Sequence, residues 1–309
     1  MFTTLLTGLL ACVPKYSELP AMPPSELEAP LPVQTLTVDG VEIAYIDSGG
    51  DGQPLVFIHG LSSYMGFWEY QLPEFAGDYR VLALDLPGYG SSARPDAPCT
   101  PPWYADVIAG WMDAVGAPEA VLVGHSMGGQ IALTLAVEQP ERVRGLILSA
   151  PAGVETFSRG AGDWMKDYWH EERALEANEA AVRASMRLVF NNHDAGVERL
   201  VEERVRLGQD PAFRGTSVAV SRSIAGMIDH PVAHRLGEIT APTLFVFGTD
   251  DRLIPNAIFN GGRTRAVAEA GRDAVPDAEL VLLKGAGHTA HHDDPAGFNA
   301  ALRAFLSKL

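Results

Sequence analysis

Cysteine and positive charge are both scarce in this sequence of 309 residues. The two cysteines, Cys12 and Cys99, are too few for a disulfide framework or for a zinc site built from thiolates. The 23 Lys and Arg residues are outnumbered by 39 Asp and Glu, which gives a formal net charge of −16. Such a chain lacks the basic patch that nucleic acids and anionic lipid surfaces require. The sequence therefore predicts no nucleic-acid partner, and its charge favours neutral substrates over anionic ones.

Hydrophobic runs long enough for a membrane helix are also lacking. The apolar stretch Met1–Ala11 is too short to span a bilayer, and it ends in Leu9–Cys12, which resembles the cleavage site of a bacterial lipoprotein. On this interpretation residues 1–32 are a signal and tether, unstructured over Val13–Pro32, and Cys12 is lipidated. The protein would then be a periplasmic or outer-membrane lipoprotein whose membrane contact is this N-terminal lipid anchor. No Lys or Arg precedes the apolar run, as a secretory signal usually requires, so a cytoplasmic protein with an irregular N-terminus is the alternative.

Short apolar segments recur from Val33 onward and alternate with helix-length segments. Two of them, Gln34–Val38 and Val41–Asp47, flank the pair Asp39-Gly40, which predicts a hairpin with a two-residue turn. Six others are apolar throughout, which is typical of strands buried on both faces of a parallel sheet. These are Leu55–Ile58, Val81–Leu84, Val121–Val123, Leu146–Leu148, Leu244–Phe247 and Leu280–Leu283. The pattern predicts the α/β class, with a doubly wound, mostly parallel sheet of about eight strands.

The alternation is interrupted between residues 154 and 240. This region has no evident strand, and the amphipathic spacing of Val197–Arg206 is typical of a helix. An all-helical insertion between two strands predicts a cap over the carboxyl edge of the sheet, where open α/β folds bind ligands. We therefore expect a core of residues 33–153 and 241–309 and a helical cap of residues 154–240.

The segment Val121–Gly129 contains the motif with the clearest chemistry. It joins a buried strand to a helix through Gly124-His125-Ser126-Met127-Gly128, a G-x-S-x-G sequence. A turn this sharp strains its central residue and exposes the serine hydroxyl at the edge of the sheet. The N-terminal end of the following helix favours negative charge that develops at the same place. Ser126 is therefore the predicted nucleophile.

A serine hydroxyl is a poor nucleophile without a general base and an acid that orients the base. His288, in the loop after the last predicted strand, is the predicted base, whereas His291 and His292 are expected to be solvated. Asp250 and Asp251 both follow the strand before it, and Asp251 has the better spacing in its loop.

The tetrahedral intermediate of acyl transfer also needs hydrogen-bond donors for its oxyanion. The predicted donors are two backbone N–H groups. One belongs to Leu61, in the loop after the strand Leu55–Ile58, and the other to Met127, directly after the serine.

Together these motifs resemble the α/β-hydrolase superfamily of lipase- and esterase-like proteins, from about Val33 to Leu309. The resemblance rests on His59-Gly60, Asp85–Ser92, Gly124–Gly129, Gly248–Pro255 and Gly287-His288. The chain order Ser126, Asp251, His288 is the order of this family. The resemblance implies that Asp85 is structural, and the serine at the elbow disfavours the members that use an aspartate nucleophile.

The resemblance implies a serine hydrolase that cleaves a small carboxylic ester through an acyl-enzyme intermediate, with no cofactor and no metal. Three alternatives stay open: hydrolysis of a carbon–carbon bond in a vinylogous diketone, cofactor-free perhydrolase or haloperoxidase chemistry, and a hydrolase-like protein that only binds a ligand. The sequence predicts neither the substrate nor the oligomeric state.

Overall fold

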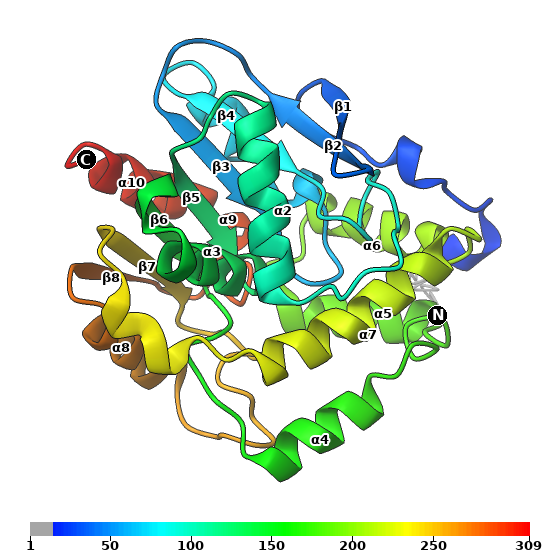
Figure 1. Cartoon of the computed structure of the whole chain (residues 1–309). Helices are drawn as coiled ribbons and strands as arrows, with labels where there is room; N and C mark the ends of the chain where they lie inside the picture. Colours follow the sequence, from blue (N-terminus) through cyan, green and yellow to red (C-terminus); the bar gives the residue numbers. More distant parts are fainter. Residues whose placement is uncertain (1–14) are drawn as a thin grey trace, which may run out of the picture.

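The computed structural model describes residues 15–309 and is built on one eight-stranded sheet (Figure 1). The strand order is β1-β2-β4-β3-β5-β6-β7-β8; β1 and β2 run antiparallel to their neighbours, and the remaining pairs are parallel. The strands are β1 (Val33–Val38), β2 (Val41–Asp47), β3 (Pro54–Ile58), β4 (Arg80–Leu84), β5 (Ala120–His125), β6 (Val143–Ser149), β7 (Thr243–Gly248) and β8 (Ala278–Leu283). The predicted fold class is confirmed.

Apolar residues on both sides of the strands explain why helices cover both faces of this sheet. Every residue of β5 and of β7 is buried, as their continuous apolarity predicts. One face packs against α2 (Pro101–Ala114), α3 (Met127–Glu138) and α8 (Thr264–Ala274). The opposite face packs against α1 (Leu72–Phe75), α9 (Ala290–Asp293) and α10 (Pro295–Leu306). The loops at the carboxyl ends of the strands are thereby fixed by a packed core on either side.

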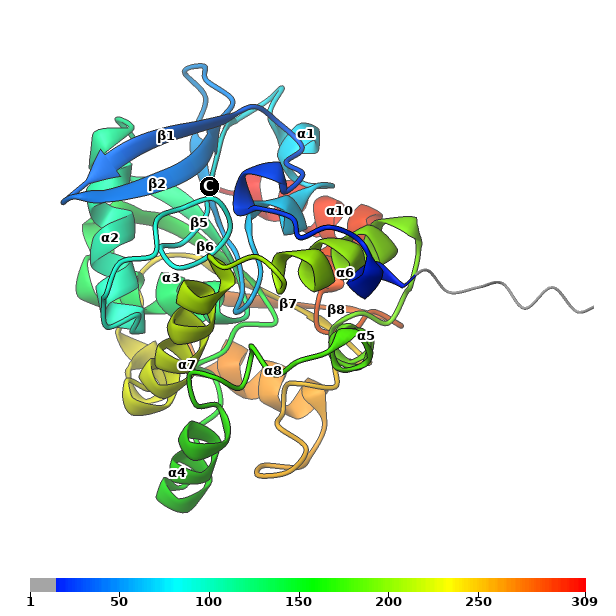
Figure 2. The ribbon, with the colours of Figure 1, turned by 90° about the vertical axis from the view of Figure 1, so that its right-hand side faces the viewer.

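Four helices lie between β6 and β7, all within residues 154–240. They are α4 (Arg159–Tyr168), α5 (Glu179–Val189), α6 (Ala195–Leu207) and α7 (Phe213–Asp229). Three of them begin at a capping side chain, Ser158, Asn178 or Asp194, which accepts a hydrogen bond from a backbone N–H of the first turn. Figures 1 and 2 show these helices grouped on one side of the sheet, with α4 projecting farthest from it. We call them the cap.

Residues 15–32 differ from the unstructured tether expected there. They form two short 3₁₀ turns, η1 (Tyr16–Glu18) and η2 (Pro24–Glu26), and lie beside α6 (Figure 2). The Tyr16 side chain is buried in an apolar cluster with α5 and α6, and both the backbone N–H and the hydroxyl of Ser17 donate to the Glu179 carboxylate. These partners lie far away in the sequence, so the Pro-rich composition of the segment gives no sign of them. We call residues 15–32 the N-terminal strap.

The predicted lipidation site, Cys12, lies outside the described residues, so its lipidation stays a prediction. Within residues 15–309, no helix combines the length and the apolarity needed to cross a membrane.

Candidate active site

The turn between β5 and α3 holds Ser126 in a strained conformation. Ser126 has φ 51° and ψ −115°, a left-handed φ that non-glycine residues rarely adopt. The glycines on either side let the chain turn this tightly. A Cβ on Gly124 would lie 2.5 Å from the carbonyl oxygen of Gly128, and a Cβ on Gly128 would lie 2.3 Å from that of Ile58. The geometry is that of a nucleophile elbow, with the serine at its apex.

His288 and Asp251 are joined by a buried hydrogen bond. His288 Nδ1–H donates to Asp251 Oδ2 at 2.9 Å, and the two side chains are 5% and 0% exposed. The other carboxylate oxygen accepts from the backbone N–H groups of Leu253 and Ile254, at 2.7 and 3.0 Å. The carboxylate is therefore held from two sides. Because Nδ1 carries the proton, Nε2 of the imidazole is the nitrogen left to accept one.

Of the two neighbouring aspartates, the structure places Asp251, and not Asp250, against His288. Asp250 is exposed, and its carboxylate accepts a hydrogen bond from the hydroxyl of Thr249 instead. Asp251 follows β7 and His288 follows β8, so two adjacent parallel strands deliver the pair to the same edge of the sheet.

The loop after β3 lies directly against the elbow. A Cβ on Gly60 would lie 2.8 Å from His125 Nδ1 and 3.3 Å from the Ser126 Cβ, so a larger residue here would crowd the elbow. Leu61 comes next and lines the same cavity as Ser126. Met127 is the first residue of α3, where a helix has no internal acceptor for its N–H. Both amides predicted as oxyanion donors are thus located beside the serine or in its cavity.

A cavity of about 1030 Å³ separates the core from the cap. Ser126, His288 and Leu61 line its core side. Its cap side is mostly apolar, with Val182, Met186, Val189, Leu200, Val205, Leu207, Phe213 and Val220 among the lining residues. Such a volume, apolar with a few polar groups, suits a small organic ligand.

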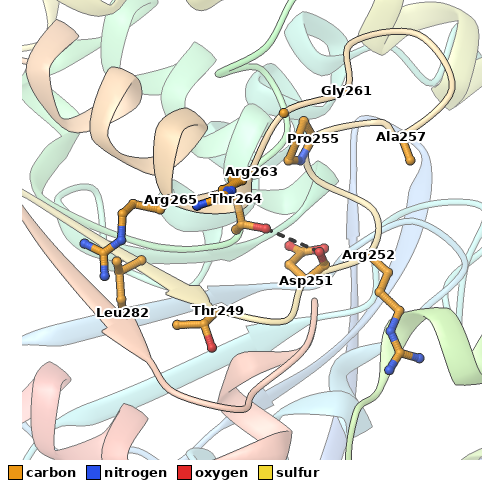
Figure 3. A pocket seen from close by; sticks show the side chains of 11 residues that line it. Thr249, Asp251, Arg252, Pro255, Ala257, Gly261, Arg263, Thr264, Arg265 and Leu282 are labelled. Carbon is orange, nitrogen blue, oxygen red and sulfur yellow. Dashed lines mark hydrogen bonds between the residues drawn. The ribbon is translucent and has the colours of Figure 1, made fainter.

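A second hollow, of about 610 Å³, lies behind Asp251 (Figure 3). Its lining includes neither Ser126 nor His288, and in it the Thr264 hydroxyl donates to the Asp251 carbonyl at 3.3 Å. Figure 3 shows that the side chains of Arg252 and Arg265 extend away from each other. The candidate site is therefore the larger cavity, which Ser126 and His288 line.

The expectation that His291 and His292 are solvated is wrong. The side chain of His291 is fully buried, and its ring lies 4.2 Å from that of Trp68. His292 is 3% exposed and its Nε2 lies 2.9 Å from a Glu69 carboxylate oxygen. Both histidines belong to the short helix α9, whose four residues are all buried. One helical turn is too short to give a periodic signal in the sequence, so nothing in the pattern indicated this.

His125 supports the position of His288. Its Nε2–H donates to the backbone carbonyl of His288 at 3.2 Å, and its ring lies 4.9 Å from the His288 ring. Its unprotonated Nδ1 is buried with no hydrogen-bond partner in the described part of the chain. Burial lowers the pKa of His125 well below its usual value, and the neighbouring His291 and His288 act in the same direction. The ring therefore stays neutral beside the loop that holds His288.

Asp85, implied to be structural, lies outside the lining of the cavity. Its buried carboxylate accepts from the backbone N–H groups of Met65 and Ser91, both at 2.7 Å, and so ties two loops together. Burial raises the pKa of Asp85 to about 6.

The chain belongs to the alpha/beta hydrolase family, whose model matches residues 55–301. The 2-hydroxymuconate semialdehyde hydrolase of Pseudomonas sp. strain CF600 is 30% identical over 278 residues, 87% of this chain and 92% of that one. A probable hydrolytic enzyme from Pseudomonas aeruginosa PAO1 has the same fold, with a TM-score of 0.82, 23% identity and coverage of 93% and 98%. A thermophilic esterase from Thermogutta terrifontis superposes with a TM-score of 0.74, 25% identity and coverage of 90% and 98%. The protein is a hydrolase of this family.

Proposed function

We propose that the protein is a serine hydrolase that cleaves carboxylic esters, with Ser126 as nucleophile, His288 as general base and Asp251 as the acid that orients it. The observation that carries the proposal is the buried 2.9 Å hydrogen bond between His288 and Asp251, in a site that shares its cavity with the strained Ser126. The structural relative described as an esterase supports the ester as the bond cleaved.

The reaction follows from the tautomer of His288. Nε2 takes the proton of the Ser126 hydroxyl while the oxygen attacks the ester carbonyl, and Asp251 stabilises the imidazolium. The amides of Leu61 and Met127 bind the oxyanion. His288 then returns the proton to the leaving alcohol, which gives the acyl-enzyme. Water, deprotonated by the same histidine, attacks the acyl group and releases the acid and the free serine.

The alternative with specific support is hydrolysis of a carbon–carbon bond. The 30% identical relative is named a 2-hydroxymuconate semialdehyde hydrolase, and the same serine, histidine and aspartate would serve that reaction. The two functions differ in substrate rather than in these residues, so substrate assays separate them.

The test is hydrolysis of p-nitrophenyl esters from acetate to palmitate. We expect wild-type turnover with an optimum set by the cavity, and a loss of roughly 10⁴-fold or more in kcat for Ser126→Ala. Ser185→Ala, which removes an exposed serine from the cavity wall on α5, is the matched control and should retain activity. Absence of turnover on every ester would refute the ester assignment, and the diketone would then be tested.

The same assay tests the choice of acid. Asp251→Asn should lower kcat about 10³- to 10⁴-fold, because an amide cannot stabilise the imidazolium or fix its tautomer. Asp250→Asn, at the exposed neighbouring position, should change it less than threefold. A larger loss for Asp250→Asn would contradict the assignment of Asp251.

A further inference from the structure

Most of the charged side chains that line the large cavity form an ion pair with a residue of opposite charge, but one of them has no such partner among residues 15–309. Each carboxylate has a nearby cation. The pairs are Glu203 with Arg199 at 2.7 Å, Glu179 with Arg183 at 2.9 Å and Glu176 with Arg173 at 3.6 Å. Glu203 also accepts a hydrogen bond from the Tyr64 hydroxyl. Each of these three carboxylates therefore has a cation beside it, and two of the cations, Arg199 and Arg183, also contact carboxylates outside the cavity lining.

Arg204, on α6, is the exception. It lines the cavity, and no described residue provides it with a carboxylate partner. One Nη1–H donates to the backbone carbonyl of Ser62 at 3.3 Å, and the guanidinium lies 5.0 Å from the centre of the Phe213 ring. Burial lowers the pKa of Arg204 to about 10, so the side chain is still a cation at neutral pH.

A guanidinium carries five N–H donors, and a carbonyl at 3.3 Å engages one of them. A half-buried cation without an anion is costly, and an aromatic ring offsets only a small part of that cost. The planar donor pair of arginine matches a carboxylate, which it binds through two parallel hydrogen bonds. Arg204 lines a cavity whose cap side is otherwise mostly apolar.

The position of Arg204 relates this cation to the chemistry. Its contact, Ser62, directly follows Leu61, the proposed oxyanion donor, and both residues line the cavity together with Ser126. An anion on Arg204 would thus share the cavity with the scissile ester. The net charge of −16 argues for neutral substrates only at long range, where salt screens it, whereas Arg204 acts at contact distance.

We propose that Arg204 binds a carboxylate of the substrate, so that the enzyme prefers esters that carry a second, anionic group. The inference rests on the proposed esterase function and adds the substrate class to it. One guanidinium without a carboxylate partner in the described chain matches a singly charged carboxylate better than a doubly charged phosphate monoester.

The test compares esters that differ only in this charge. One pair is the p-nitrophenyl hemiester of glutaric acid and its neutral primary amide; a second pair, 4-acetoxybenzoate and 4-acetoxybenzamide, places the charge on the alcohol side. In at least one pair we expect wild-type kcat/KM to be at least 10-fold higher for the carboxylate. Arg204→Gln should lower kcat/KM for that carboxylate roughly 10- to 100-fold and for the amide less than threefold. Arg204→Lys should recover part of the preference.

Arg206→Gln is the matched control, because Arg206 is on the same helix but pairs with Glu202 outside the cavity. Equal kcat/KM for carboxylate and amide in the wild type, in both pairs, would overturn the proposal, and that comparison needs no variant to fold. Equal losses on both substrates in Arg204→Gln would also overturn it, because they would mean that Arg204 acts only through the Ser62 carbonyl.

If the wild type cleaves none of these esters, the proposed function fails and the binding site is tested separately. Calorimetric titration would then compare glutarate with its neutral diamide on wild type and on Arg204→Gln. Tighter binding of glutarate that disappears in the variant would uphold the anion site. Equal binding of the two compounds would refute it.

Discussion

The core and the cap of this hydrolase are each stabilised by a different kind of interaction. Every residue of β5 and β7 is buried, and the loops that follow these strands hold Ser126 and Asp251. In contrast, α4 and α5 each bury only two residues, and the large side chains Trp164 and Leu188 are nearly half exposed. Apolar packing on both faces thus fixes the residues of the proposed chemistry. The helices α4 and α5 have much less of it, whereas α6 and α7 bury six and eight residues.

Polar contacts also hold the cap in place. Arg199 on α6 bonds Glu203 on the same helix at 2.7 Å, Glu69 of the core at 2.8 Å and Glu28 of the N-terminal strap at 3.5 Å. One side chain therefore joins three parts of the chain. We therefore expect a change in the core to act on the whole molecule and a change in the cap to act locally.

The largest contrast in the free energy of unfolding is expected when one glycine of the core, Gly128, and one glycine of the cap, Gly160, are each replaced by alanine. In Gly128→Ala the new Cβ would lie 2.3 Å from the Ile58 carbonyl oxygen, in a backbone contact that cannot relax cheaply. We expect a loss of about 3–5 kcal/mol in the free energy of unfolding. In Gly160→Ala nothing lies within 4 Å of the new Cβ, and alanine favours the helix, so we expect a gain of about 0.5–1 kcal/mol.

Urea denaturation followed by circular dichroism measures both changes. Similar midpoints for Gly128→Ala and Gly160→Ala would contradict the claim that the elbow depends on close backbone contact. Measurement of the unfolding free energy from the midpoint and slope of each curve makes the two values comparable.

Acid should weaken the core through His59. Its Nδ1–H donates to the Gly60 carbonyl at 2.8 Å and its Nε2 accepts from the Leu86 N–H at 3.0 Å, so protonation of Nε2 would break the second of these bonds. Burial lowers the pKa of His59 to about 4, against about 6.5 in the unfolded chain. Between these values the unfolded state binds more protons, so stability is lost as the pH falls from about 6.5 to 4, by about 3 kcal/mol.

His59→Gln, whose amide can donate and accept without titrating, should remove this loss. The quantity to measure is the difference in unfolding free energy between wild type and variant across that pH range. The difference cancels the opposite contribution of Asp85, whose raised pKa increases stability as the pH falls below about 6. His234→Gln, at an exposed position near the cap, is the control. An unchanged pH dependence in His59→Gln would refute the role of His59.

The difference between core and cap also determines which features can be predicted from the sequence. The strands of the core can be predicted because continuous apolar runs mark them, and the predicted strand segments all fall within the observed strands. The elbow can be predicted because its glycines are sterically required. The contacts of the cap cannot be predicted in this way, because they join residues that are distant in the sequence. Tyr64, for example, donates a hydrogen bond to Glu203, which lies 139 positions away. The amphipathic pattern of α6 identifies a helix but not that Arg204 faces the cavity, and the burial of His291 depends on a turn too short for any period.

The smallest expected effect is that of a substitution at Arg199. It tests most directly whether the cap can open while the core stays folded. Arg199→Met keeps the apolar stem of the side chain but leaves Glu203, which is 3% exposed, without its cation. We expect a local loss of about 1–2 kcal/mol, since the Tyr64 hydroxyl still donates to Glu203. Hydrogen exchange should then be about tenfold faster or more for amides of α6 and unchanged for those of β5, because local opening exposes α6 alone.

Arg206→Met, which removes a more peripheral pair on the same helix, should leave both rates nearly unchanged. Equal acceleration of α6 and β5 in Arg199→Met would mean that cap and core open as one unit, and the distinction between them would fail. Faster exchange confined to α6 would mean that the cavity can open while the proposed catalytic groups stay fixed. In that case the polar contacts of the cap govern how a substrate enters, and the apolar core keeps the geometry with which it reacts.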